Sequence, residues 1–147
     1  MKIIIIVGFE EKTGAIGYKG QLYYSSKQDM AHFRKTTINT LSKEKQNLII
    51  MGRNTWDSLP RKPLEGRKNI VLTSRPITGY GDKIHIFNRV EQIFEYIRLH
   101  EGEYENAYII GGGSVYQAFL EMNMVDEIIA SVFVAKGDIE NHQADTF

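Results

Sequence analysis

The chain has 147 residues, of which 42% are hydrophobic and 11% aromatic, and this composition predicts one compact domain rather than two. Eighteen basic residues balance eighteen acidic ones, so no overall field would attract nucleic acid or an anionic membrane. The absence of cysteine excludes disulfides and thiolate metal sites, and the apolar run 3–7 is too short to span a membrane.

The first third of the chain predicts a strand, a loop and a helix. Residues 2–9 are apolar and β-branched without alternation, which is typical of a central strand covered on both faces. Three glycines between residues 14 and 20 mark a loop without helical or strand periodicity. An apolar stripe then predicts a helix that begins after Ser26 and ends near Leu41.

Strands and helices alternate over the rest of the chain. Apolar runs predict strands at 47–51, 68–74, 107–110 and 128–134, a brief helix from Asn54 to Pro60, and longer helices at 90–100 and 114–120. This alternation predicts an α/β fold with a single, mostly parallel central sheet flanked by helices on both faces. Ligands of such sheets bind beyond the carboxyl ends of the strands.

One of these strand ends carries a glycine-rich turn. The run Ile110-Gly111-Gly112-Gly113-Ser114-Val115-Tyr116 passes from a predicted strand into a predicted helix. Glycines allow a ligand to approach the backbone, and amides at a helix N-terminus favour phosphate oxygens. The GxGxxG spacing is absent, so a phosphate site and an ordinary tight turn are equally good interpretations of this run alone.

Two further strand ends offer phosphate-binding side chains. The segment Met51-Gly52-Arg53-Asn54-Thr55-Trp56 presents a guanidinium, an amide and a hydroxyl, and Thr73-Ser74-Arg75 follows the next strand. Taken alone, Asn54 is more simply a helix cap and Arg53 a surface charge. Three such strand ends together favour a ligand that contains phosphate.

Asp29 is a candidate for acid–base chemistry because it lies in a predicted first helical turn beside Met30 and Phe33. A carboxylate next to an apolar pocket can hold a planar amidine-like edge by two hydrogen bonds and raise the proton affinity of that heterocycle. An aspartate at this position also stabilises a helix dipole, and the spacing alone favours that simpler interpretation.

The order of these motifs along nearly the whole chain resembles dihydrofolate reductase. The resemblance rests on Ile16-Gly17, then Leu22, Asp29, Phe33 and Thr37, then the segments MGRNTW, LEGRKNIVLTSRP and IIGGGSVY. It implies a dihydrofolate reductase-like fold and an NADPH-dependent oxidoreductase of one-carbon metabolism that is an antifolate target. In that family, 7,8-dihydrofolate becomes 5,6,7,8-tetrahydrofolate by hydride transfer to pterin C6 and protonation at N5.

The resemblance implies roles for residues around the substrate. Asp29 is the catalytic candidate, since the family's pocket carboxylate binds the pterin edge and assists protonation of N5. Leu22 and Tyr24 belong to the active-site loop; Tyr24 stands where the family usually has tryptophan, so we expect activity to be altered rather than abolished. The substrate-binding candidates are Ile6, Met30, Phe33, Leu64, Arg67 as the partner of the glutamate tail, and Ser131 behind the aspartate.

The resemblance also implies an NADPH site and no metal. Gly111 and Gly112 resemble the family's cis Gly-Gly bond, and Ser114 stands where some relatives carry an additional arginine. The expected cofactor-binding residues are Gly8, Ile16, Gly17, Arg53, Asn54, Thr55, Thr73, Ser74, Arg75, Ile110, Gly111, Gly112, Gly113, Ser114, Val115 and Tyr116. We expect a preference for NADPH over NADH, because hydroxyl and cationic groups suit a 2′-phosphate.

Residues 1–147 are expected to form one domain that lacks the family's C-terminal antiparallel hairpin, because residues 145–147 resemble the loop before it. We expect a cytoplasmic monomer, with dimerisation through the open sheet edge as an alternative, and no nucleic-acid or membrane partner. Two other functions stay open: a non-catalytic folate- or NADPH-binding descendant, and a relative of the riboflavin-pathway pyrimidine reductase. Asp29, Phe33 and Arg67 favour the folate enzyme.

Overall fold

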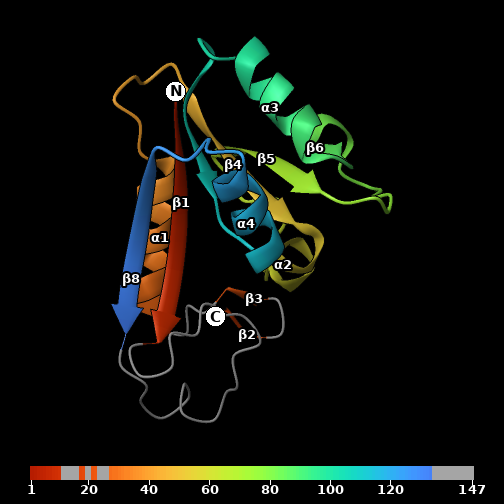
Figure 1. Cartoon of the computed structure of the whole chain (residues 1–147). Coiled ribbons are helices and arrows are strands. Elements are labelled where there is room, and N and C mark those ends of the chain that lie inside the picture. The colour runs from red at the N-terminus through yellow and green to blue at the C-terminus, as the bar shows by residue number, and fades with distance from the viewer. Residues whose placement is uncertain (11–16, 19–20, 23–26, 134–147) are drawn as a thin grey trace.

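A six-stranded parallel sheet organises the structure, a computed structural model that describes residues 1–10, 17–18, 21–22 and 27–133 (Figure 1). The strand order is β6-β5-β4-β7-β1-β8, and every neighbouring pair in this sheet is parallel. Its strands are β1 (Lys2–Glu10), β4 (Gln46–Gly52), β5 (Arg67–Leu72), β6 (Ile84–Phe87), β7 (Tyr104–Ile109) and β8 (Glu127–Phe133). The predicted α/β architecture is confirmed.

Helices cover the sheet on both faces. They are α1 (Lys27–Ile38), α2 (Arg53–Ser58), α3 (Val90–Leu99) and α4 (Gly113–Glu121), with a short 3₁₀ turn η1 (Gly81–Lys83) before β6. None of the helices in the described ranges is long and apolar enough to cross a membrane. The amphipathic helix predicted at 90–100 is α3, which turns Ile93 and Ile97 into the core.

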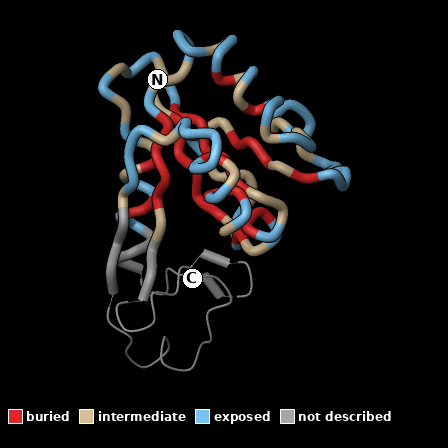
Figure 2. Tube along the Cα trace, viewed as in Figure 1, coloured by how far each residue is buried: buried red, intermediate tan, exposed pale blue. Residues whose placement is uncertain are grey.

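The unbroken apolar run of β1 follows from burial on both of its faces. Ile3 and Ile5 pack into one core with α3 and α4, whereas Ile4 and Ile6 pack into the other with α1 and α2. Successive side chains of a strand point to opposite faces, so a strand between two helical layers needs an apolar residue at every position. Figure 2 shows the buried residues concentrated along the central strands.

Helix α1 ends at Ile38, three residues before the predicted end at Leu41. The buried side chain of Asn47 donates to the carbonyl oxygens of Thr37 and Asn39, both at 2.9 Å. The amide of Leu41 instead donates to the carboxylate of Glu105, at 2.6 Å. These polar contacts from β4 and β7 end the helix, and they depend on tertiary neighbours that periodicity cannot reveal.

Three other features differ from the sequence-based predictions. The loop expected between β1 and α1 contains a short antiparallel pair, β2 (Gly17–Tyr18) and β3 (Gln21–Leu22). Strand β6 is present although the sequence does not predict it. Asn54 does not cap α2, because the helix begins one residue earlier with Gly52 at the N-cap position, and Asn54 is exposed within it.

Candidate active site

A cavity of about 550 Å³ opens between α1, the loop 59–65 and the start of β5. Part of its lining is apolar: Phe33 and Leu59 belong to the core on that face, and Leu64 packs against it. Charged side chains make up much of the rest, and Arg67 is the buried one among them. The cavity thus joins a surface that suits an aromatic ring to a cation that suits a carboxylate.

Arg67 is held in place by its own neighbours. It is 7% exposed, and its Nε donates to the carbonyl oxygen of Glu65 at 3.0 Å while its Nη1 donates to Thr37 Oγ1 at 2.9 Å. Thr37 Oγ1 donates in turn to the carbonyl oxygen of Phe33 at 2.9 Å. The guanidinium is therefore fixed where α1 meets β5, and its Nη2 has no partner within the described ranges.

The electrostatic surroundings of Arg67 favour an anion. Burial and, to a smaller extent, the charge of Arg34 lower the pKa of Arg67 to about 10, against an opposing effect of Glu65. Arg67 remains a cation at neutral pH, but its charge is less well compensated than in water. A carboxylate in the cavity would compensate it.

Asn69 holds the loop that forms one wall of the cavity. Its fully buried side chain donates from Nδ2 to the carbonyl oxygen of Leu64 at 2.9 Å and accepts at Oδ1 from the Leu64 amide at 2.9 Å. Neither Asn69 nor Thr37 is predicted from the sequence to have a role in the site. For Asn69 the available signal is a polar residue directly before the apolar run Ile70 to Leu72 of the same strand; Thr37 gives none beyond its place in the family resemblance.

The glycine-rich turn lies where β4, β7 and α4 meet. The carbonyl oxygen of Gly111 accepts from the amide of Gly52 at 2.8 Å, and the Gly111–Gly112 bond is cis, as the resemblance implies. A Cβ added to Gly111 would lie 3.0 Å from Thr55 Oγ1. The close approach that requires glycine here is therefore to α2.

The residues that flank these glycines support the turn from within the protein. Ile110, Val115 and Tyr116 are all buried in the two cores. The hydroxyl of Tyr116 donates to the carbonyl oxygen of Ile6 at 3.0 Å, which ties α4 to β1. Ser114, by contrast, is exposed in the first turn of α4.

A second, open groove of about 400 Å³ lies at the carboxyl ends of β5 and β6. The predicted phosphate-binding residues Thr73, Ser74 and Arg75 line it together. The amide of Thr73 donates to the carbonyl oxygen of Phe87 at 2.8 Å, which joins the two strand ends. The opposite side consists of Ile86, Phe87, Asn88 and Gln92. The sequence does not indicate this side of the groove, because no strand is predicted at Ile86 and Phe87.

Arg53 and Thr55, both predicted to bind the cofactor, serve different parts of this region. Arg53 Nε donates to Asp57 at 3.0 Å, and Arg53 Nη1 donates to the carbonyl oxygens of Arg75 and Pro76 at 3.3 and 3.5 Å. Arg53 thus braces the loop after β5 and is not simply a surface charge. Thr55 is buried beneath the glycine-rich turn.

Several predicted site residues are placed by their backbone alone. Gly8 on β1 lies opposite Ser131 on β8, and Gly17 on β2 lies opposite Leu22 on β3. Asp29 and Met30 lie in the first turn of α1, one helical turn before Phe33 and Arg34. Ile16 and Tyr24 lie outside the described residues, as do the side chains of Leu22, Asp29, Met30 and Ser131.

Comparison with known proteins decides the family. A family model described as "Dihydrofolate reductase" matches residues 2–147. The chain belongs to the dihydrofolate reductase family. Members of that family are oxidoreductases, so the predicted enzyme class is confirmed along with the fold.

Three similar proteins are named dihydrofolate reductase. The one from Heliothis virescens is 36% identical over 123 residues, 80% of this chain and 65% of the relative. The Candida albicans protein is 30% identical over 149 residues, 99% and 74% of the two chains, and the Ureaplasma parvum protein is 34% identical over 120 residues, 82% and 68%. The chain thus spans between 65% and 74% of the length of these relatives.

Replacing Arg67 with Gln is expected to raise the Kd for dihydrofolate about 10- to 100-fold, since hydrogen bonds to charged groups contribute roughly 1.5–3 kcal/mol. Isothermal titration calorimetry would measure the change. The control is Arg98→Gln, because Arg98 is exposed and pairs only with Glu95 within the described residues. An unchanged Kd in Arg67→Gln would show that Arg67 does not bind the substrate.

Proposed function

We propose that this member of the dihydrofolate reductase family uses NADPH to reduce 7,8-dihydrofolate to 5,6,7,8-tetrahydrofolate, with hydride transfer to pterin C6 and protonation at N5. The observation that carries the proposal is the cavity that joins Phe33 and Leu64 to the buried cation Arg67. Dihydrofolate has the complementary order of groups, because an aromatic ring system precedes a glutamate tail. The apolar lining would hold the ring, and Arg67 would bind the α-carboxylate.

Within this proposal, Asp29 holds the pterin and assists its protonation at N5. It precedes Phe33 by one helical turn, so its backbone lies beside the cavity-lining part of α1. Its carboxylate would accept two hydrogen bonds from the pterin amide and amino edge, which fixes the ring and favours its protonated form. The chain's contribution to catalysis is then orientation in a site with little water and electrostatic support of the cationic pterin.

The groove at the ends of β5 and β6 supports NADPH as the cofactor. Ser74 and Arg75 offer a hydroxyl and a guanidinium, and the exposed side chain of Ile86 offers an apolar surface next to them. This donor set suits an adenosine that carries a 2′-phosphate. When bound, NADPH supplies the hydride; the chain's residues hold its phosphates and position the nicotinamide near the glycine-rich turn.

The test is a comparison of NADPH and NADH oxidation in the presence of dihydrofolate, followed by the loss of absorbance of the reduced cofactor. We expect kcat/KM to favour NADPH by about 10- to 100-fold, because a charge-assisted contact to the 2′-phosphate contributes roughly 1.5–3 kcal/mol. Arg75→Gln should lower this ratio, whereas Arg98→Gln should leave it unchanged. Equal use of both cofactors would contradict the proposed selectivity.

The remaining proposals concern the state and ligands of the protein. We infer a single-domain, cytoplasmic monomer that binds antifolates at the substrate site and has neither nucleic-acid nor membrane partners. Supporting observations are the balanced charge and the continuous sheet from β6 to β8. Antifolate binding would appear as a rise in melting temperature, since a ligand that binds only the folded state stabilises it.

A further inference from the structure

Asn47 is a buried side chain that joins three elements of the structure. It lies on β4, is fully shielded from solvent, and donates from Nδ2 to the carbonyl oxygens of Thr37 and Asn39, both at 2.9 Å. Its Oδ1 accepts from the amide of Asn106 on β7 at 3.1 Å. Because Asn47 uses both donors and its acceptor inside the protein, its side chain has one orientation, and it fixes the C-terminal end of α1 against the sheet.

The pairing of β4 with β7 is irregular at Asn47. The register of the two strands shifts between Gln46 and Leu48, and such a shift re-aims groups that a regular ladder would use. Here the amide of Asn106 donates to the Asn47 side chain. The carboxylate of Glu105, next to it, accepts from two backbone amides of the turn after α1, at 2.6 and 3.0 Å. The irregular part of β7 therefore supports the end of α1 twice.

Asn47 and Arg67 are direct neighbours on adjacent strands and reach the same residue of α1. They pair in the parallel register of β4 and β5. Asn47 donates to the carbonyl oxygen of Thr37, and Arg67 Nη1 donates to the Thr37 hydroxyl at 2.9 Å. Thr37 is fully buried, so water cannot replace either contact. Thr37 is thus held at one oxygen by Asn47 and holds Arg67 with the other.

We propose that Asn47 is a positioning residue for the glutamate tail of the substrate, because it fixes Thr37 and thereby the guanidinium of Arg67. The inference rests on the proposed function, in which Arg67 binds the α-carboxylate of that tail. Among the described residues, Asn47 does not line the cavity, so it acts on the tail through Thr37. Hydrogen bonds weaken steeply as their angle departs from linear, so a displaced Thr37 would weaken the contact between Arg67 and the carboxylate.

The part of the cavity that suits the ring is held by other contacts. Phe33 packs into the core on the α1 side of the sheet, and the backbone of Leu64 is bonded to the side chain of Asn69. Loss of the Asn47 contacts should therefore affect the tail of the substrate far more than its ring. A general loss of stability would instead affect every substrate alike, which separates the two roles.

The test measures kcat and KM of Asn47→Ala with two substrates: dihydrofolate and 7,8-dihydrobiopterin, a dihydropterin whose side chain carries no carboxylate. We expect KM for dihydrofolate to rise about 3- to 10-fold, since hydrogen bonds to charged groups contribute at least that much to affinity. Its kcat should hardly change, because the tail contact is made equally in the ground state and the transition state. For dihydrobiopterin, kcat/KM should stay within about twofold of the parent.

The dependence on Arg67 is tested by repeating the substitution in Arg67→Gln. In that background Asn47→Ala should change KM for dihydrofolate by less than about twofold, because the contact that Asn47 positions is already lost. If Asn47→Ala does not fold, Asn47→Ser takes its place in both backgrounds. A serine hydroxyl offers one donor where the asparagine amide offers two, so the hold on α1 is still weakened.

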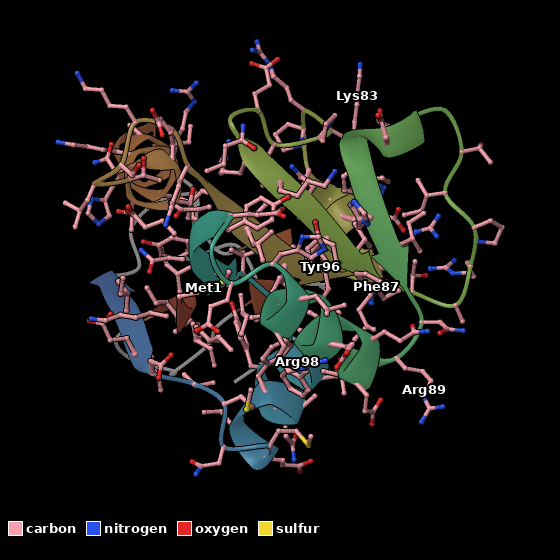
Figure 3. The ribbon with its side chains drawn as sticks, turned by 90° about the horizontal axis from the view of Figure 1, so that it is seen from above. Met1, Lys83, Phe87, Arg89, Tyr96 and Arg98 are labelled. Carbon is pink, nitrogen blue, oxygen red and sulfur yellow. The ribbon has the colours of Figure 1, made fainter. Side chains whose placement is uncertain are left out.

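The matched control is Ile97→Ala on α3, which creates a cavity in the core on the other face of the sheet. In Figure 3, α3 carries the labelled Tyr96 and Arg98 and lies across the sheet from α1, whose Phe33 belongs to the opposite core. This control should lower the melting temperature, as Asn47→Ala does, but should keep the parent's ratio of kcat/KM for the two substrates.

The possible failures are distinguishable. If Asn47→Ala impairs both substrates equally, its role is structural; the inference is then wrong and the proposed function stands. The same conclusion follows if KM for dihydrofolate does not change, or if the full effect persists in Arg67→Gln. If the parent reduces neither substrate, the proposed function and the inference are overturned together.

Discussion

Asp29→Asn is expected to lower kcat for dihydrofolate reduction by about 100-fold or more at neutral pH, because a positioned acid–base group contributes roughly 10²–10⁴-fold. Asparagine keeps the size of the side chain but lacks the negative charge that favours the protonated pterin. The measurement is steady-state oxidation of NADPH with dihydrofolate, run on the parent and the variant across pH. The deficit should become smaller at acidic pH, where solvent supplies the proton.

Two comparisons make the Asp29 prediction specific. Asp82→Asn removes an exposed carboxylate that does not line the cavity and should keep the kcat of the parent. A kcat of Asp29→Asn equal to that of the parent at neutral pH would exclude Asp29 from the chemistry. An inactive parent whose melting temperature still rises with methotrexate would instead support a non-catalytic folate-binding descendant.

The elements that can be predicted from the sequence are those in which buried apolar residues recur at a regular spacing. Strand β1 is predictable because burial on both faces demands apolar residues throughout, and Ile3 to Ile6 meet that demand. Helix α3 is predictable because its buried residues, Ile93 and Ile97, recur at helical spacing. In both elements, the positions of the apolar residues in the sequence show which side chains face the core.

Strand β6 and the Thr37–Arg67 contact cannot be predicted from the local spacing of apolar and polar residues. Strand β6 has four residues, of which Ile84 is buried and Ile86 exposed at the end of the sheet, so it offers too short a pattern to predict. Thr37 contacts Arg67 only because α1 packs beside the start of β5. Arg67 is the first residue of β5, so it lies at the amino end of the strand and away from the carboxyl ends, where ligands of parallel sheets are expected.

Gly52 and Gly111 show that a sequence motif can locate a turn without revealing which contacts its residues make. From the residues alone, the glycines of the turn fit a phosphate site and an ordinary tight turn equally well, and only the family resemblance assigns them to the cofactor. In the structure the tight contacts are internal, since the Gly52 amide binds the Gly111 carbonyl and Thr55 lies against Gly111. The location of the turn is therefore predictable, whereas its partner on α2 comes from the packing of β4 against β7.

Gly111→Ala is expected to lower the free energy of unfolding by about 2–3 kcal/mol, since a strained backbone conformation costs of order 1–3 kcal/mol and a steric contact adds to it. Gly111 has φ +139°, which L residues rarely adopt, and an added Cβ would lie 3.0 Å from Oγ1 of the buried Thr55. Thermal unfolding would measure the change, as a fall in Tm of roughly 5–10 °C for a chain of this size.

A matched control and a second substitution separate the two causes of that loss. Gly102→Ala places a methyl where no heavy atom lies within 4 Å, so its stability should stay within about 0.5 kcal/mol of the parent. Thr55→Ala combined with Gly111→Ala removes the contact with Oγ1 but keeps the unfavourable φ. Partial recovery in this double variant would assign the recovered part to the contact and the remainder to the backbone. A Gly111→Ala protein as stable as the parent would show that the turn adjusts freely, and that neither Thr55 nor the φ angle constrains it.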